Sequence, residues 1–100
     1  MTADAGPSRS RVLIVEDMTF VRESLCQLLS AQPDLEVIAD TEFGEEAIRL
    51  VDEQAPHVVL LDLVLESSRI NGLDVLKHIL ANSPATLPLK HGVVSVYSVP

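Results

Sequence analysis

The sequence is poor in cysteine, in aromatic residues and in basic residues, and each shortage narrows the possibilities. A single cysteine, Cys26, excludes an internal disulfide. Only 3% of the residues are aromatic, so the core must be built from aliphatic side chains. Seven basic residues against fifteen acidic ones give a net charge of −8. This sign argues against direct binding to nucleic acid or to an anionic membrane surface.

The N-terminal part has no signal-peptide pattern, in which a charged segment precedes an apolar one, and it has no long apolar run. Together with the single cysteine, this predicts a protein of the reducing cytoplasm. Hydrophobic residues make up 47% of the chain, which is typical of a folded protein, and 100 residues are enough for one small domain. Residues 1–10 are small and polar, so we predict a disordered N-terminal tail and a domain over residues 11–100.

Short apolar runs that predict strands alternate along the chain with segments of helical periodicity. The expected strands are 11–15, 35–40, 57–62 and 92–98, and the expected helices are 19–31, 44–54 and 72–81. This alternation predicts an α/β fold with a doubly wound parallel sheet. In a flavodoxin-like strand order of 2-1-3-4, the first and third strands are neighbours.

Apolar residues at helical spacing mark the helix faces that should pack on this sheet. They are Val21, Leu25, Leu28 and Leu29 in the first helix, Ala47, Ile48 and Val51 in the second, and Leu73, Leu76, Ile79 and Leu80 in the third.

Acidic residues lie at the carboxyl ends of two of these strands. Glu16 and Asp17 follow the first strand, and Asp62 ends the third, inside the apolar run HVVLLDLVL. Ligands of doubly wound sheets bind outside the carboxyl ends of the strands, so these carboxylates should share one rim. Like charges at such a rim repel one another unless they are protonated or bind a cation. Mg²⁺ would offset this repulsion and would allow a carboxylate to act as nucleophile toward a phosphoryl group.

Other interpretations of these residues are less specific. An acid pair after a strand is often only a solvated turn or helix start. An aspartate-nucleophile phosphohydrolase needs a second aspartate two residues after the first, where this chain has Val64. Dinucleotide binding requires a glycine-rich turn, which IVEDMTF does not provide. Ser98, at the end of the fourth strand, is placed to donate a hydrogen bond to a phosphoryl oxygen.

Four segments resemble, in order, the motifs of the receiver (CheY-like) domain of two-component response regulators. VLIVED resembles its first strand with the acid pair, and HVVLLDLVL resembles its third strand with the phosphate-accepting aspartate. NGLDVL resembles the start of its third helix, and VSVYS its fourth strand. PDLEVIAD and GEEAIRLV are most similar to receivers of helix-turn-helix transcription regulators.

The resemblance implies a phosphorelay function without other enzymatic activity than the domain's own phosphorylation and dephosphorylation. Asp62 would take a phosphoryl group from a phosphohistidine of a sensor histidine kinase or a phosphotransfer protein. Mg²⁺ would be held by Glu16, Asp17, Asp62 and the backbone carbonyl of Val64. Ser98 would then move toward the phosphoryl group and change the surface that partners contact.

The chain departs from the family pattern in two places. Leu65 and Glu66 stand where a Met-Pro-like pair is usual, and the loop after them is longer. Receivers also continue past the position of Ser98 through a helix, a fifth strand with a lysine, and a last helix, so we expect a C-terminally truncated, partial receiver. The alternative function is an interaction module without phosphotransfer. An uncovered fourth strand predicts self-association.

Overall fold

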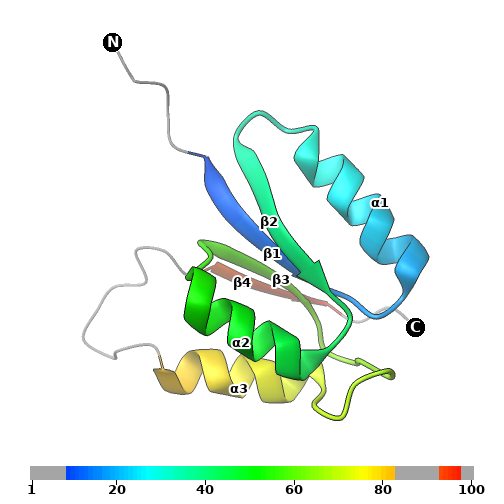
Figure 1. Cartoon of the computed structure of the whole chain (residues 1–100), viewed down its shortest axis with the longest axis vertical. Helices are drawn as coiled ribbons and strands as arrows, with labels where there is room; N and C mark the ends of the chain where they lie inside the picture. Colours follow the sequence, from blue (N-terminus) through cyan, green and yellow to red (C-terminus); the bar gives the residue numbers. More distant parts are fainter. Residues whose placement is uncertain (1–8, 83–92, 98–100) are drawn as a thin grey trace.

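The computed structural model describes residues 9–82 and 93–97, which build a parallel sheet with helices on both faces (Figure 1). The strands are β1 (Ser10–Val15), β2 (Leu35–Thr41), β3 (Val58–Asp62) and β4 (Val93–Tyr97). The helices are α1 (Thr19–Ser30), α2 (Gly44–Gln54) and α3 (Gly72–Asn82). The sheet order β2-β1-β3-β4, with every pair parallel, confirms the predicted order and fold class.

The main core lies between the two central strands and the helices α2 and α3. β1 is covered on both faces, which is why its sequence is a continuous apolar run without alternation. β3 is covered by the core on one face, whereas Val58 and Leu60 on its other face are half-buried. The buried side chains of this core are Leu13, Val15, Ala47, Val59, Leu61, Leu65 and Val75. The expected contribution of α2 is confirmed, because Ala47 is fully buried and Ile48 and Val51 pack against the same cluster.

Among the helices of residues 9–82, α1 covers the opposite face of the sheet, as Figure 1 shows. It packs over β1 and β2 but contains no fully buried residue. The prediction that Leu28 belongs to its packed face is wrong, since that side chain is 65% exposed. Because α1 packs mainly over β1 and β2 among the described strands, the side of its apolar stripe that contains Leu28 faces solvent.

The predicted packed face of helix α3 is confirmed for Leu76 and Ile79, which pack against the core, and is wrong for Leu73 and Leu80. Leu73 and Leu80 are 47% and 59% exposed, while Val75 is fully buried. A Cβ atom at Gly72 would lie 1.9 Å from the carbonyl oxygen of Asp62, so the helix begins in direct backbone contact with the end of β3. No helix in residues 9–82 has the length and hydropathy needed to cross a bilayer.

Candidate functional site

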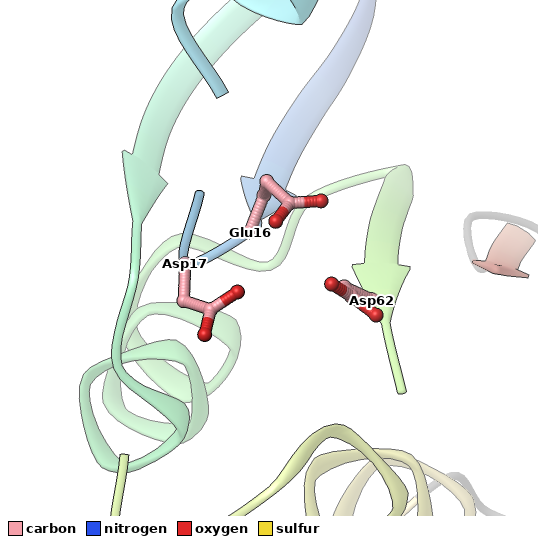
Figure 2. A group of neighbouring side chains, drawn as sticks. All are labelled: Glu16, Asp17 and Asp62. Carbon is pink, nitrogen blue, oxygen red and sulfur yellow. The ribbon is translucent and has the colours of Figure 1, made fainter. Parts of the chain in front are cut away.

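The carboxyl ends of β1 and β3 bring the predicted acidic residues together. Val15 pairs with Leu61 in the parallel register, so Glu16 and Asp62 follow on neighbouring strands. Figure 2 shows the carboxylates of Glu16, Asp17 and Asp62 in the space between the two strand ends. One oxygen of each lies within 4.8 Å of one oxygen of each of the others. The predicted acidic cluster is therefore present.

Two of these carboxyl groups are buried and accept hydrogen bonds from the backbone just beyond each strand. Glu16 is fully buried and Asp62 is 2% exposed. The N–H of Met18 donates to Oε2 of Glu16 at 2.9 Å, and the N–H of Val64 donates to Oδ1 of Asp62 at 3.0 Å. Both bonds span two residues, so the turn that leaves each strand supplies the donor. These donors reduce the penalty of burying an acidic group.

The environment of Asp62 disfavours its charged form. Burial raises the pKa of Asp62 above its usual value, and the Val64 N–H opposes this only in part. The neighbouring charges of Glu16 and Asp17 and a hydrogen bond with Glu16 raise the pKa further. Within residues 9–82 and 93–97, neither Asp17 nor Asp62 forms an ion pair with a basic side chain. A bound cation is the partner that would favour ionised carboxylates here.

Asp17 is held by the loop between β3 and α3. Its Oδ2 accepts hydrogen bonds from the N–H groups of Glu66 at 2.6 Å and Ser67 at 3.4 Å. Sequence reasoning missed this contact, because the donors are backbone groups and any residue type can supply them. It connects segments that lie 49 and 50 residues apart in the chain.

Arg22 of α1 is a second residue that sequence reasoning missed. Its Nη1 donates to the backbone carbonyl of Glu16 at 2.9 Å, and its Nε forms an ion pair with Asp40 at 3.3 Å. The side chain is only 14% exposed. The sequence offered one sign of this contact, an arginine in the first turn of the helix that follows Glu16 and Asp17.

The other predicted site residues are less well defined. The N–H of Val64 holds Asp62, and its side chain is 49% exposed, but the metal-binding role of its carbonyl stays a prediction. Ser98 lies outside the described residues. The residue before it, Tyr97, pairs with Asp62 across β3 and β4.

The chemistry of the donors fits a hard divalent cation. The three side chains offer only carboxylate oxygens, and hard cations prefer oxygen ligands. Mg²⁺ in particular is usually bound through one or two carboxylates with water and substrate phosphate oxygens completing its shell. No histidine or cysteine belongs to this group, so the donor set does not resemble a zinc or copper site.

Comparison with known proteins identifies the family. Residues 12–92 match the family model of the response regulator receiver domain. The transcriptional regulatory protein LiaR of Bacillus subtilis is 44% identical over 69 residues, which are 69% of this chain and 32% of LiaR. A protein-glutamate methylesterase/protein-glutamine glutaminase of Pyrococcus abyssi is 42% identical over 74% of this chain and 20% of its own length. The chain thus spans about a third or less of these relatives.

Solved structures agree with this assignment. The receiver domain of the response regulator NarL from Mycobacterium tuberculosis superposes with a TM-score of 0.76 at 25% identity, over 92% of this chain and 68% of that one. The response regulator domain of Thermotoga maritima CheB gives a TM-score of 0.70 at 33% identity, over 76% of this chain and 55% of that one. By fold, acidic cluster and sequence, the chain belongs to the response regulator receiver domain family.

Proposed function

We propose that this receiver domain accepts a phosphoryl group on Asp62 from a phosphohistidine of a sensor histidine kinase or a phosphotransfer protein. The observation that carries the proposal is the position of Asp62. It ends a buried central strand and lies within 4.8 Å of the other two carboxylates of the cluster. An oxygen of Asp62 forms the new bond to phosphorus, while the P–N bond of the donor breaks and its electron pair returns to the histidine nitrogen.

We infer that Glu16, Asp17, Asp62 and the backbone carbonyl of Val64 hold Mg²⁺. The ion offsets the charge of the carboxylates and of the incoming phosphoryl oxygens. The Val64 N–H fixes one oxygen of Asp62, which limits the rotation of the carboxylate. Burial of Glu16 and Asp62 excludes most water from the inner side of the site. Ser98 comes directly after Tyr97 in the sequence, and Tyr97 pairs with Asp62; the Ser98 hydroxyl would donate its hydrogen to a phosphoryl oxygen.

The proposal is tested by phosphorylation with a small donor. We expect wild-type protein incubated with acetyl phosphate and Mg²⁺ to gain the mass of one phosphoryl group, measured by intact mass spectrometry. Asp62→Asn should gain none, because it lacks the nucleophilic oxygen. The matched control Asp34→Asn removes an exposed aspartate outside the cluster and should be phosphorylated like wild type.

Omission of Mg²⁺ or its chelation should abolish the adduct in every variant. Absence of an adduct from the wild type at all Mg²⁺ concentrations would contradict the proposal and favour the alternative, a receiver that acts only through protein interaction. An adduct that persists in Asp62→Asn would show that another residue accepts the phosphoryl group.

A further inference from the structure

The loop between β3 and α3, residues 63–71, contacts both the acidic cluster and the start of α2. On one side, the consecutive N–H groups of Glu66 and Ser67 donate to the Asp17 carboxylate. The next residue, Ser68, turns to the other side and meets the N-terminus of α2. The loop therefore joins a carboxylate of the site to a helix on the core face of the sheet.

The hydroxyl of Ser68 connects the loop to α2 through hydrogen bonds in both directions. Its Oγ accepts from the N–H of Gly44 at 2.8 Å, and it donates its single proton to Glu45 Oε1 at 2.7 Å or to the Ile70 carbonyl at 2.5 Å. The N-cap residue of α2, Phe43, makes no side-chain capping hydrogen bond. Ser68 thus supplies from the loop an acceptor that helix N-termini usually obtain from their own N-cap side chain.

Two further observations support the docking of this loop on α2. A Cβ atom at residue 44 would lie 2.2 Å from the carbonyl oxygen of Ile70, so loop and helix meet where only a glycine fits. The backbone N–H of Glu45 lowers the pKa of the Glu45 carboxyl most, and the hydrogen bond from the Ser68 hydroxyl, the charge of Arg69 and the Arg69 backbone lower it further. The Glu45 carboxylate is therefore ionised at neutral pH and available as an acceptor.

We propose that Ser68 is a positioning residue, which docks the β3–α3 loop on α2 so that the N–H groups of Glu66 and Ser67 orient Asp17 for Mg²⁺. This inference rests on the proposed function. Hydrogen bonds to a ligating carboxylate fix its direction, and their loss typically lowers metal affinity 10–100-fold. Ser68 acts one step further from the metal, through the loop.

The test is Mg²⁺ binding by Ser68→Ala, measured by calorimetric titration with MgCl₂. We expect the dissociation constant to rise on the order of 10-fold, the lower end of the range for such outer contacts. Ser30→Ala is the matched control, because Ser30 is an exposed serine at the end of α1, away from the loop, and its hydroxyl makes no hydrogen bond within the described part of the chain. Ser68→Thr, which keeps a hydroxyl, should bind Mg²⁺ like wild type.

Two measurements separate positioning from a loss of stability. Val51→Ala weakens the packing of α2 away from the loop and should lower the melting temperature without changing the Mg²⁺ affinity of the folded protein. In metal-free protein, amide hydrogen exchange at Glu66 and Ser67 should become faster in Ser68→Ala and stay unchanged in Val51→Ala. A drop in affinity shared by Ser68→Ala and Val51→Ala would overturn the inference.

The remaining outcomes distinguish this inference from the proposed function. Wild-type protein that binds no Mg²⁺ would overturn both. Wild-type protein that binds Mg²⁺ with an affinity that Ser68→Ala leaves unchanged would overturn the role of Ser68 alone.

Discussion

Asp62 shows how a strand built for burial can carry an acidic side chain. The run that contains it is apolar because β3 is a central strand, and the carboxyl group comes at the residue where the strand ends. Even there the side chain is 2% exposed, and burial together with two neighbouring carboxylates raises its pKa. The residue that we propose as nucleophile therefore destabilises the metal-free fold, as is common for functional groups.

Removal of this charge should stabilise the metal-free protein. We expect Asp62→Asn to raise the free energy of unfolding at neutral pH on the order of 1 kcal/mol, the usual size of a single-residue effect. The asparagine side chain keeps an oxygen that can accept from the Val64 N–H. Urea unfolding followed by circular dichroism, in the presence of a chelator, measures the difference.

The pH dependence follows from the raised pKa of Asp62. The stability linked to its protonated form is fully present below the unfolded-state pKa and is lost as pH rises through the raised native pKa. Asp62→Asn should therefore match wild type in acid and exceed it increasingly as pH rises through that window. The control Asp34→Asn, on an exposed residue, should show no such divergence. An Asp62→Asn protein that is less stable than wild type at neutral pH would contradict the argument.

At the scale of elements, the bounds of strands and helices were predictable to within one residue, but the packed faces of α1 and α3 were predicted only in part. The strand HVVLLD is one continuous apolar run, and the helix GEEAIRLVDEQ has one apolar stripe. In α3 the predicted stripe contained Leu73, Leu76, Ile79 and Leu80, of which Leu76 and Ile79 pack against the core beside Val75. The helix begins in close backbone contact with the end of β3 at Gly72, and periodicity does not encode this contact.

Helix α1 has a polar anchor, Arg22, beside its half-buried apolar side chains. It has no fully buried residue, whereas Arg22 is largely buried and joins the helix to the Glu16 carbonyl and to Asp40 of β2. The same contact fixes the backbone at the start of the acidic cluster. An anchor of this kind also limits the movement of α1 relative to the site.

The contribution of Arg22 can be separated from that of an ordinary surface arginine. We expect Arg22→Ala to lower the free energy of unfolding by about 2 kcal/mol, since charged hydrogen bonds with low exposure contribute about 1.5–3 kcal/mol. The control Arg49→Ala removes the same charge from an exposed pair of contacts with Glu46 and Glu53 and should change stability by less than about 1 kcal/mol. Chemical denaturation compares the two, and equal effects would argue against the anchor.

For the whole molecule, the strand order was the step that made the site predictable. Once β1 and β3 are neighbours, acidic residues at their carboxyl ends must share a rim, and the structure confirms that they do. The loop and Arg22 contacts around that rim were not predictable, because they depend on the path of the backbone between elements. Site residues on strand ends are thus encoded in sequence patterns, while the groups that orient them emerge only in three dimensions.

The sheet as described also has an edge that should promote self-association of a polypeptide made of residues 1–100. β4, with the uncharged sequence VVSVY, pairs only with β3 among the described strands, and Val58 and Leu60 on the α1 face are only half-buried. Exposed β-prone edges pair with other chains, whereas a net charge of −8 opposes association by repulsion.

Salt should therefore shift the balance between these two effects. Because added NaCl screens the repulsion and leaves edge pairing intact, we expect the mass measured by sedimentation equilibrium to rise with protein concentration, and to rise more steeply at high salt. Association driven instead by attraction between unlike charges would weaken as salt is added, which makes the sign of the salt effect diagnostic. A monomeric mass at every protein and salt concentration would show that the edge is protected within the chain itself.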